Sequence, residues 1–298
     1  MRRSVAAMPA LALACLVAPA STLAQHAYIT NEGSSTVSVI DTATNTVIAT
    51  IPVGSHPQGV AVTPDGSRVY VANQGAVEGV GTVSVISTAT NTVTGIPISV
   101  GRAPVGVAVT PDGSKVYVAN TNDGTVSVIS TATDTVIAPP IPVGSLPWGV
   151  AVTPDGSKVY VVNLIDGTVS VVSTATDTVI GPPIPVGSAP EGVAVTPDGS
   201  KLYVASLGVG TVSVVSTATN TVIGPAIPVG SEPVAFGVFI QPPQPETTFA
   251  GMSGYSNCYG TSISALVRQY GGLNAAASAL SFPSVKALQN ATMAYCGG

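Results

Sequence analysis

The stretch "GVAVTPDGSKVYVAN" at residues 106–120 decides the fold, because it recurs almost unchanged at 59–73, 149–163 and 192–206. Aligned on the glycine before Val-Ala-Val, the copies begin at Gly59, Gly106, Gly149 and Gly192, with a degenerate fifth at Gly237, so the spacings are 47, 43, 43 and 45 residues. A tandem period of this length is typical of propeller blades or helical arrays. The units contain no helical periodicity, which favours blades.

Each unit predicts four short antiparallel strands. In the second unit, side chains of alternating character mark "GVAVT" (106–110), "KVYVAN" (115–120), "TVSVIS" (125–130) and "TVIAPPIPV" (135–143). The first two strands are joined by Thr-Pro-Asp-Gly, in which proline suits the first central position of a turn and glycine accepts a positive φ. The last two are joined by "STATD", whose side chains can hydrogen-bond their own backbone. A repeated unit of this kind is a propeller blade.

The two ends of the repeat region complement each other. Residues 26–57 begin in the middle of a unit and lack an innermost strand, and "GVFIQ" at 237–241 supplies one. The sequence therefore predicts an all-β propeller of four-stranded antiparallel blades, five in number, closed by the N-terminal strands plus a C-terminal strand, with a small α-helical C-terminal domain. Closure removes exposed sheet edges. An open arc, or assembly through a partner chain, is the alternative.

The letters "VYVAN" and "TVSVIDTATNTV" resemble the YVTN family of β-propeller repeats over roughly 26–241, and "SRVYVAN…GTVSVISTATNTV" at 67–93 carries the motif. The resemblance implies an exported or surface-exposed propeller, often seven-bladed and often without assigned chemistry. Five units depart from that number.

Composition points to an exported acidic protein. Only 8% of residues are charged, against roughly 25% in an ordinary soluble domain. Residues 1–24 resemble a cleaved signal peptide, with Arg2 and Arg3 before an apolar run and a small-residue site ending at Ala24. Cleavage leaves seven basic and 14 acidic residues, a formal net charge of −7. This charge excludes long-range attraction to nucleic acid, and no segment of the mature chain predicts a membrane span.

Comparison of the units separates scaffold positions from variable ones. The variable positions lie in the loop before the innermost strand and in the loop between the second and third strands, which are expected at one face of the ring. The candidate ligand-binding residues there are His56, Gln58, Arg102, Leu146, Trp148, Glu191 and Glu232. Tryptophan and arginine are common at binding hot spots. We expect this face to bind a protein, a peptide or a glycan.

Catalysis is the alternative from another class. A propeller hydrolase or lactonase needs converging acids or a metal, and Glu191 and Glu232 come from adjacent units. The two histidines of the chain are too few for a histidine-clustered metal centre, so the sequence predicts no catalytic residue, metal or cofactor. A purely structural surface protein is the third interpretation.

The C-terminal segment differs sharply from the repeats. A Pro-rich linker at 242–250 leads from the propeller (25–241) into an Ala- and Ser-rich region at 251–298 with helical spacing. Cys258 and Cys296 are the thiols left after cleavage, and in an exported protein we expect them to form a disulfide that staples this helical domain.

Overall fold

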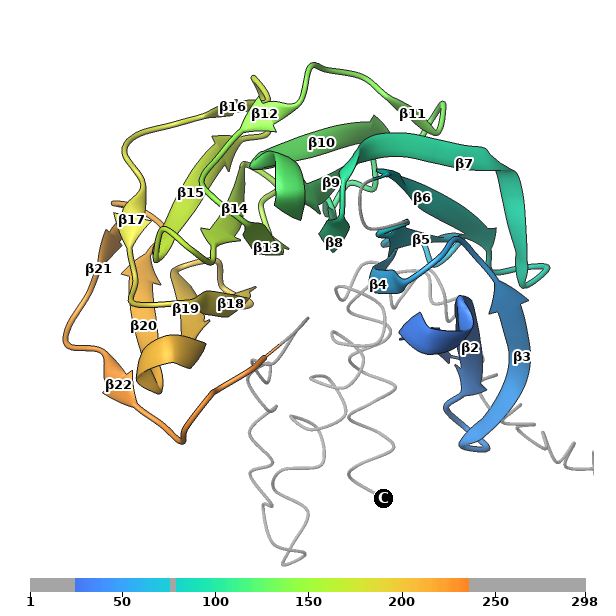
Figure 1. Ribbon diagram of the computed structural model, residues 1–298, viewed down its shortest axis with the longest axis horizontal. Helices are drawn as coiled ribbons and strands as arrows, with labels where there is room; N and C mark the ends of the chain where they lie inside the picture. The colour runs from blue at the N-terminus through green and yellow to red at the C-terminus, as the bar shows by residue number, and fades with distance from the viewer. Residues whose placement is uncertain (1–24, 76–78, 236–298) are drawn as a thin grey trace, which may run out of the picture. The chain divides into compact units, whose positions relative to one another are not determined.

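The computed structural model describes residues 25–75 and 79–235, and these form a succession of antiparallel β-sheets (Figure 1). The described residues contain three short 3-10 helices and no α-helix. The predicted linker, the helical domain and the Cys258–Cys296 disulfide lie outside them. The strand predicted at 237–241 and the predicted signal peptide also lie outside. No helix in the described part is long and apolar enough to cross a membrane.

Five sheets correspond to the five repeat units. The first contains β1 (His26–Asn31), β2 (Thr36–Asp41) and β3 (Thr46–Pro52). The second contains β4 (Pro57–Val62), β5 (Arg68–Asn73), β6 (Val80–Ser87) and β7 (Thr92–Arg102). The third contains β8 (Pro104–Val109), β9 (Lys115–Asn120), β10 (Thr125–Ser130), β11 (Thr135–Val136) and β12 (Ile141–Pro142).

The last two sheets repeat the third. The fourth contains β13 (Pro147–Val152), β14 (Lys158–Asn163), β15 (Thr168–Ser173), β16 (Thr178–Val179) and β17 (Ile184–Pro185). The fifth contains β18 (Pro190–Val195), β19 (Lys201–Ser206), β20 (Thr211–Ser216), β21 (Thr221–Val222) and β22 (Ile227–Pro228). The 3-10 turns η1 (Glu32–Ser34), η2 (Thr121–Asp123) and η3 (Leu207–Val209) follow the second strand of a unit.

The predicted fourth strand is divided in three of the sheets. In the third sheet, β11 and β12 both pair with β10, at its end and at its beginning. Pro139 and Pro140 lie between them and have no N–H to donate to the ladder, so pairing stops there. The second sheet lacks this Pro-Pro pair, and its strand β7 runs without division from Thr92 to Arg102.

The Thr-Pro-Asp-Gly turns form as expected. In the third sheet the Gly113 N–H donates to the Thr110 carbonyl at 2.8 Å, and Gly113 has a φ of 73°. The Asp112 carboxylate accepts hydrogen bonds from the Thr110 hydroxyl (2.5 Å) and the Ser114 backbone N–H (3.0 Å). These hydrogen bonds lower the pKa of Asp112 to about 2.

Apolar clusters fill the four junctions between successive sheets. The cluster between the first two sheets contains Tyr28, Val37 and Val39 from the first sheet and Val69 and Ile86 from the second. Equivalent residues form the other three clusters, between the second and third, third and fourth, and fourth and fifth sheets. The second, third and fourth sheets therefore each bury one face against the preceding sheet and the other against the following one, as propeller blades do.

A repeated polar contact, which we call the junction latch, supplements these clusters, and it is longest at the first junction, where the Tyr28 hydroxyl donates to Asn91 Oδ1 at 3.5 Å. At the third junction, the Tyr117 hydroxyl donates to Asp177 Oδ1 (2.6 Å), and Lys115 Nζ donates to Asp177 Oδ2 (2.8 Å) and the Thr174 carbonyl (2.8 Å). Tyr117 is fully buried. The "STATD" turn therefore uses its aspartate to bind the preceding sheet, which sequence reasoning did not predict.

The other latches follow the same pattern with different side chains. At the second junction Tyr70 donates to Asp134 Oδ1 (2.7 Å), and Arg68 forms an ion pair with the same carboxylate (3.2 Å). At the fourth, Tyr160 donates to Asn220 Oδ1 (2.8 Å), which also accepts from Lys158 Nζ at 3.3 Å.

The predicted closed ring is not found among the described residues. Strand β1 is the edge of a three-stranded first sheet, because the strand expected to complete that sheet lies outside the described part of the chain. Figure 1 shows the first sheet and the fifth sheet standing apart at the two ends of the succession. The prediction of four-stranded blades is confirmed for the second sheet, and for the third to fifth with the fourth strand divided in two.

Candidate functional site

The site is built on the inner strands β4, β8, β13 and β18, each of which contacts the next along the concave side of the succession of sheets (Figure 1). Each of these strands contains the glycine that begins the repeat. A Cβ on Gly106 would lie 2.1 Å from the Trp148 carbonyl oxygen, and one on Gly149 would lie 2.5 Å from the Glu191 carbonyl oxygen. Glycine is therefore required at this position, because the neighbouring backbone occupies the space of a side chain.

The residue before each glycine lines a cavity on this concave side, which we call the channel cavity. These residues are Gln58, Val105, Trp148 and Glu191, and Ala235 takes the fifth place, since its carbonyl oxygen lies 2.1 Å from a Cβ built on Gly192. We call these five the channel row. Its backbone contributes to the junctions between sheets, whereas its side chains differ at every position.

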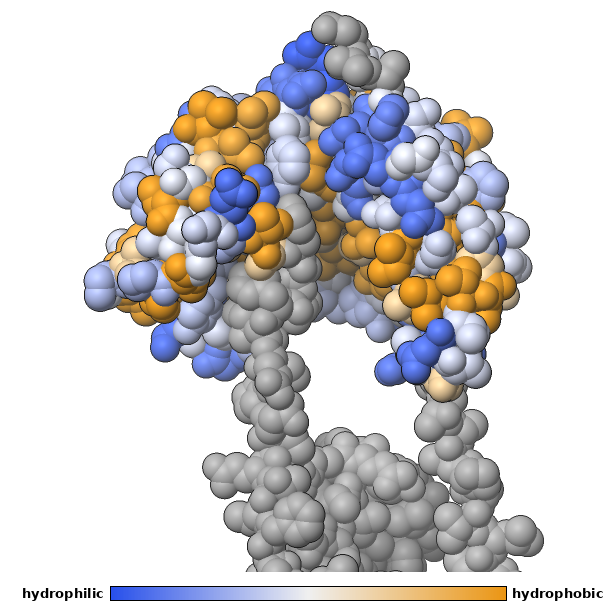
Figure 2. Space-filling model, turned by 60° about the horizontal axis from the view of Figure 1, so that its bottom comes forward, coloured by the Kyte–Doolittle hydropathy of each residue, from blue (hydrophilic) through white to orange (hydrophobic). Residues whose placement is uncertain are grey.

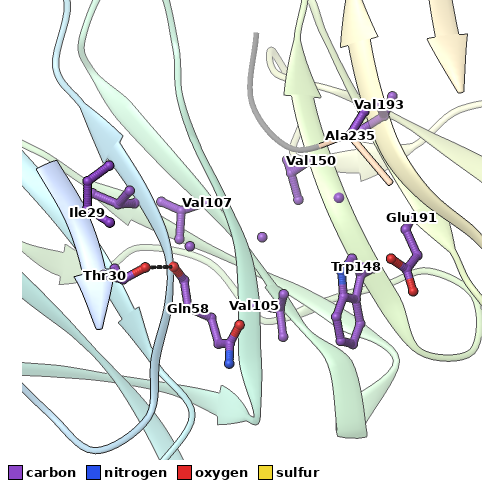
Figure 3. Close-up of a pocket in the computed structure, with 14 residues that line it drawn as sticks. Ile29, Thr30, Gln58, Val105, Val107, Trp148, Val150, Glu191, Val193 and Ala235 are labelled. Atoms are coloured by element: carbon purple, nitrogen blue, oxygen red, sulfur yellow. Dashed lines mark hydrogen bonds between the residues drawn. The ribbon is translucent and has the colours of Figure 1, made fainter. Parts of the chain in front are cut away.

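The channel row lines a cavity of about 480 Å³ (Figure 3). Val107, Val150 and Val193 form its apolar wall, and Ile29 and Thr30 of β1 close one side. The Thr30 hydroxyl donates to the Gln58 carbonyl at 2.7 Å, which joins β1 to the second sheet. An apolar pocket with few polar groups is the usual form of a ligand site.

Two polar groups of the cavity are unusual. The Trp148 Nε1–H is buried and has no hydrogen-bond partner among the described residues. Glu191 lies on the neighbouring inner strand, and burial raises the pKa of its carboxyl group. Figure 3 shows the Trp148 ring and the Glu191 carboxylate adjacent in the channel row. Buried donors without partners are rare in folded proteins, so this one marks a place where a ligand acceptor fits.

The two variable loops of each unit do meet, as predicted. The Leu164 N–H donates to the Leu146 carbonyl (3.0 Å), and the Leu207 N–H donates to the Ala189 carbonyl (2.9 Å). The Asp166 carboxylate also accepts from the Ser145 N–H at 2.7 Å. Asp166 therefore holds one loop against the other.

The structure divides the predicted site residues into two groups. Gln58, Trp148 and Glu191 line the cavity. The remaining four do not line it: His56, Leu146 and Glu232 lie on loops, and Arg102 is the last residue of β7. Among them, His56, Leu146 and Glu232 occupy one equivalent position with a φ of 51° in each case.

Arg102 differs from these three residues. Its Nε donates to Asp123 Oδ1 at 2.6 Å, and its Nη2 donates to the Asn122 carbonyl at 3.1 Å. Arg102 stands where the other units have Ser55 or Ser145, one position before the left-handed residue. It is therefore part of the contact between the two loops and does not line the cavity together with Trp148.

Sequence reasoning gave too little weight to Val105 and Ala235, which complete the channel row. The signal for Val105 was its place before Gly106, equivalent to that of Trp148 before Gly149. For Ala235 this signal is absent, because one additional residue separates it from Gly237.

The fold defines a class of protein: the described residues form a repeat protein of β-propeller-like architecture. Three solved structures are similar to it at low identity. Hydrazine synthase of Kuenenia stuttgartiensis gives a TM-score of 0.51 at 19% identity, covering 70% of this chain and 84% of that one. A functionally unknown protein from Desulfotomaculum acetoxidans DSM 771 gives 0.58 at 21%, covering 69% and 68%. Virginiamycin B lyase from Staphylococcus aureus gives 0.56 at 12%, covering 68% and 66%. These similarities show the fold alone.

Two sequence matches are shorter. A family model described as the choice-of-anchor I domain matches residues 14–99. PE-PGRS family protein PE_PGRS18 of Mycobacterium tuberculosis (strain ATCC 25618 / H37Rv) is 62% identical over 37 residues, which are 12% of this chain. The chain spans 8% of the length of that relative.

Proposed function

We propose that this chain is an exported binding protein of the YVTN repeat type, and that it holds a protein, a peptide or a glycan at the channel cavity. The choice-of-anchor match and the leader-like residues 1–24 support export to the cell surface or beyond. The propeller-like fold supports an interaction role, since propellers present binding sites where their inner strands and loops converge.

The observation that carries the proposal is the channel row itself. Five equivalent positions of nearly identical units hold five different side chains, and they enclose one cavity. In the four intact units the residues on either side are always proline and glycine, so the differences between these units are concentrated where a ligand would touch the protein. A platform with one variable surface is the arrangement expected for binding.

The cavity favours a ligand group of particular chemistry. Valine side chains and the Trp148 ring fit an apolar or ring-shaped face. The unpartnered Trp148 Nε1–H requires an acceptor, and the Glu191 carboxylate requires a donor or a cation. The hydrolase alternative is less well supported, because Glu191 is the one carboxylate that lines the cavity in the described part of the chain.

Trp148 makes the test direct, because it is the sole tryptophan of the chain and its emission reports on the cavity alone. The full chain is titrated with soluble oligosaccharides and with short peptides that carry amine or hydroxyl groups. We expect some of these to shift the Trp148 emission and to bind in calorimetry. Glu191→Gln should weaken that binding about tenfold or more, as loss of a buried charged hydrogen bond does.

Glu232→Gln is the matched control, since it makes the same chemical change on the exposed loop outside the cavity lining. It should leave both the affinity and the emission shift as in the unmodified protein. Equal weakening by the two substitutions, or binding that leaves the Trp148 emission unchanged, contradicts the proposed site.

A further inference from the structure

The faces of the two end sheets are the two halves of a junction that forms nowhere in the described structure. Each of the four formed junctions buries one isoleucine from the outer strand of the leading sheet: Ile51, Ile98, Ile141 and Ile184 are 3 to 7% exposed. The equivalent residue of the fifth sheet, Ile227, is 44% exposed. In the part of the chain that the structure describes, no sheet therefore covers the leading face of the fifth sheet.

The first sheet shows the opposite half. On the middle strand of a following sheet, Ile86, Ile129, Val172 and Val215 are fully buried against the preceding sheet. The equivalent residue Ile40 on β2 is only partly buried, although β1 and β3 flank it on both sides. Figure 2 turns the end sheets towards the viewer and shows hydrophobic surface on both.

The latch groups of this missing junction are also unpaired. Lys201 and Tyr203 of β19 correspond to Lys115 and Tyr117 of β9, but Lys201 is exposed, Tyr203 is partly exposed, and neither side chain has a polar partner in the described residues. On the first sheet, Asn45 corresponds to Asp177 and Asn220 and has the same left-handed backbone, with a φ of 53°. Its side chain is exposed. Donors stand on one end face and the acceptor on the other.

We infer that the leading face of the fifth sheet binds the first sheet of a second copy of this chain, with Lys201 and Tyr203 donating to Asn45 of that copy. The two faces carry the same residue types, in the same places, as the four junctions already formed. They do not meet within one chain, because the four packed junctions place the first and fifth sheets apart (Figure 1). The contact is head to tail, so it extends to further copies and does not stop at a dimer.

This surface is separate from the channel cavity, and the inference does not depend on the proposed ligand site. Sedimentation velocity of the full chain over a range of concentrations should show a series of species that grows beyond the dimer. Ile227→Asp places a charge at the centre of the contact and should abolish the series. Ile137→Asp is the matched control, because Ile137 is 48% exposed but lies outside the junction clusters. It should associate as the unmodified chain does.

The latch provides a gain-of-affinity test. Asn45→Asp converts the acceptor to the carboxylate found at the second and third junctions, so it should tighten association about two- to fivefold, as an exposed ion pair does. The gain should vanish in the Asn45→Asp, Lys201→Ala double variant. A gain that persists without Lys201 contradicts the pairing.

Photo-crosslinking identifies the partner. A benzophenone amino acid at position 203 is activated in an equal mixture of isotope-labelled and unlabelled chains. We expect cross-links from position 203 to residues 42–48 that join labelled to unlabelled peptides. Cross-links confined to peptides of the same label show that the chain closes on itself and overturn the inference. Cross-links to residues 236–298, or a monomer at all concentrations, overturn it equally.

Discussion

Removal of single tyrosine hydroxyls tests how the sheets are held together. Tyr117, Tyr160 and Tyr203 are equivalent residues of successive units, and their hydroxyls meet a carboxylate, an amide and no described partner, respectively. Replacing each by phenylalanine removes one oxygen atom and leaves the ring in place. The three substitutions therefore differ in the hydrogen bond that is lost, and Tyr203 is in addition partly exposed where Tyr117 and Tyr160 are fully buried.

The structure sets the order of the losses. Tyr117→Phe removes a 2.6 Å hydrogen bond to Asp177, whose side chain is 15% exposed, so we expect roughly 1.5–3 kcal/mol of lost stability. Tyr160→Phe removes a 2.8 Å bond to the neutral amide of Asn220 and should cost about 0.5–1.5 kcal/mol. Tyr203→Phe should change the free energy of unfolding by less than about 0.5 kcal/mol in dilute protein.

Urea unfolding at equilibrium, followed by circular dichroism at low protein concentration, measures these free energies. The ionisation of the tyrosines gives a second observable, because burial, followed by the hydrogen bond to Asp177, raises the pKa of Tyr117. Equal losses for the three variants, or a loss for Tyr203→Phe as large as that for Tyr117→Phe, refute the latch as the origin of the stabilisation.

Two further predictions concern the scaffold. Gly106→Ala places a Cβ 2.1 Å from the Trp148 carbonyl oxygen and should lower the free energy of unfolding by roughly 1–3 kcal/mol. Gly33→Ala is the control, because a Cβ at Gly33 has no atom within 4 Å and should leave stability almost unchanged. Thermal unfolding compares the two variants, and equal midpoints contradict the close approach at Gly106. Hydrogen bonds hold the pKa of Asp112 at about 2, below the ordinary value of 3.8, so its contribution to stability is present above about pH 4 and is lost as the pH falls towards 2. Asp65, Asp155 and Asp198 have the same lowered pKa, so Asp112→Asn should reduce that acid decline in unfolding experiments without removing it, and an unchanged decline contradicts the assignment.

The strands could be predicted well because the same sequence pattern recurs in every unit. The turn at Asp112 and the strands on either side of it form where the sequence places them. The division of the fourth strand at Pro139 was visible in the sequence but was not predicted. The latch was harder to predict, because Asp177 and its partner Tyr117 are 60 residues apart. The turn that contains Asp177 meets the strand that contains Tyr117 only because the fourth sheet packs on the third.

The candidate site was predicted in part for a related reason. Gln58, Trp148 and Glu191 were recognised as variable, but so were loop residues that the structure excludes from the cavity lining. Variation between units identifies positions without a scaffold role, and it does not distinguish a residue that faces the channel from one that faces solvent. Arg102 shows the difference, because its charge is paired with Asp123 between two loops.

The geometry of the inner strands explains how near-identical units can surround a site with unlike side chains. Gly106 and Tyr117 contact the following sheet, and Asp134 contacts the preceding one, so a change at any of them disturbs a junction. Trp148 also takes part in a junction, but through its carbonyl oxygen, which every residue type supplies equally. Its side chain also packs against the apolar cluster between the fourth and fifth sheets, but it lines the cavity and is not fixed to one residue type, since Gln58, Val105 and Glu191 take the same place in other units. The channel row is therefore the place where this repeat can change its chemistry without changing its fold.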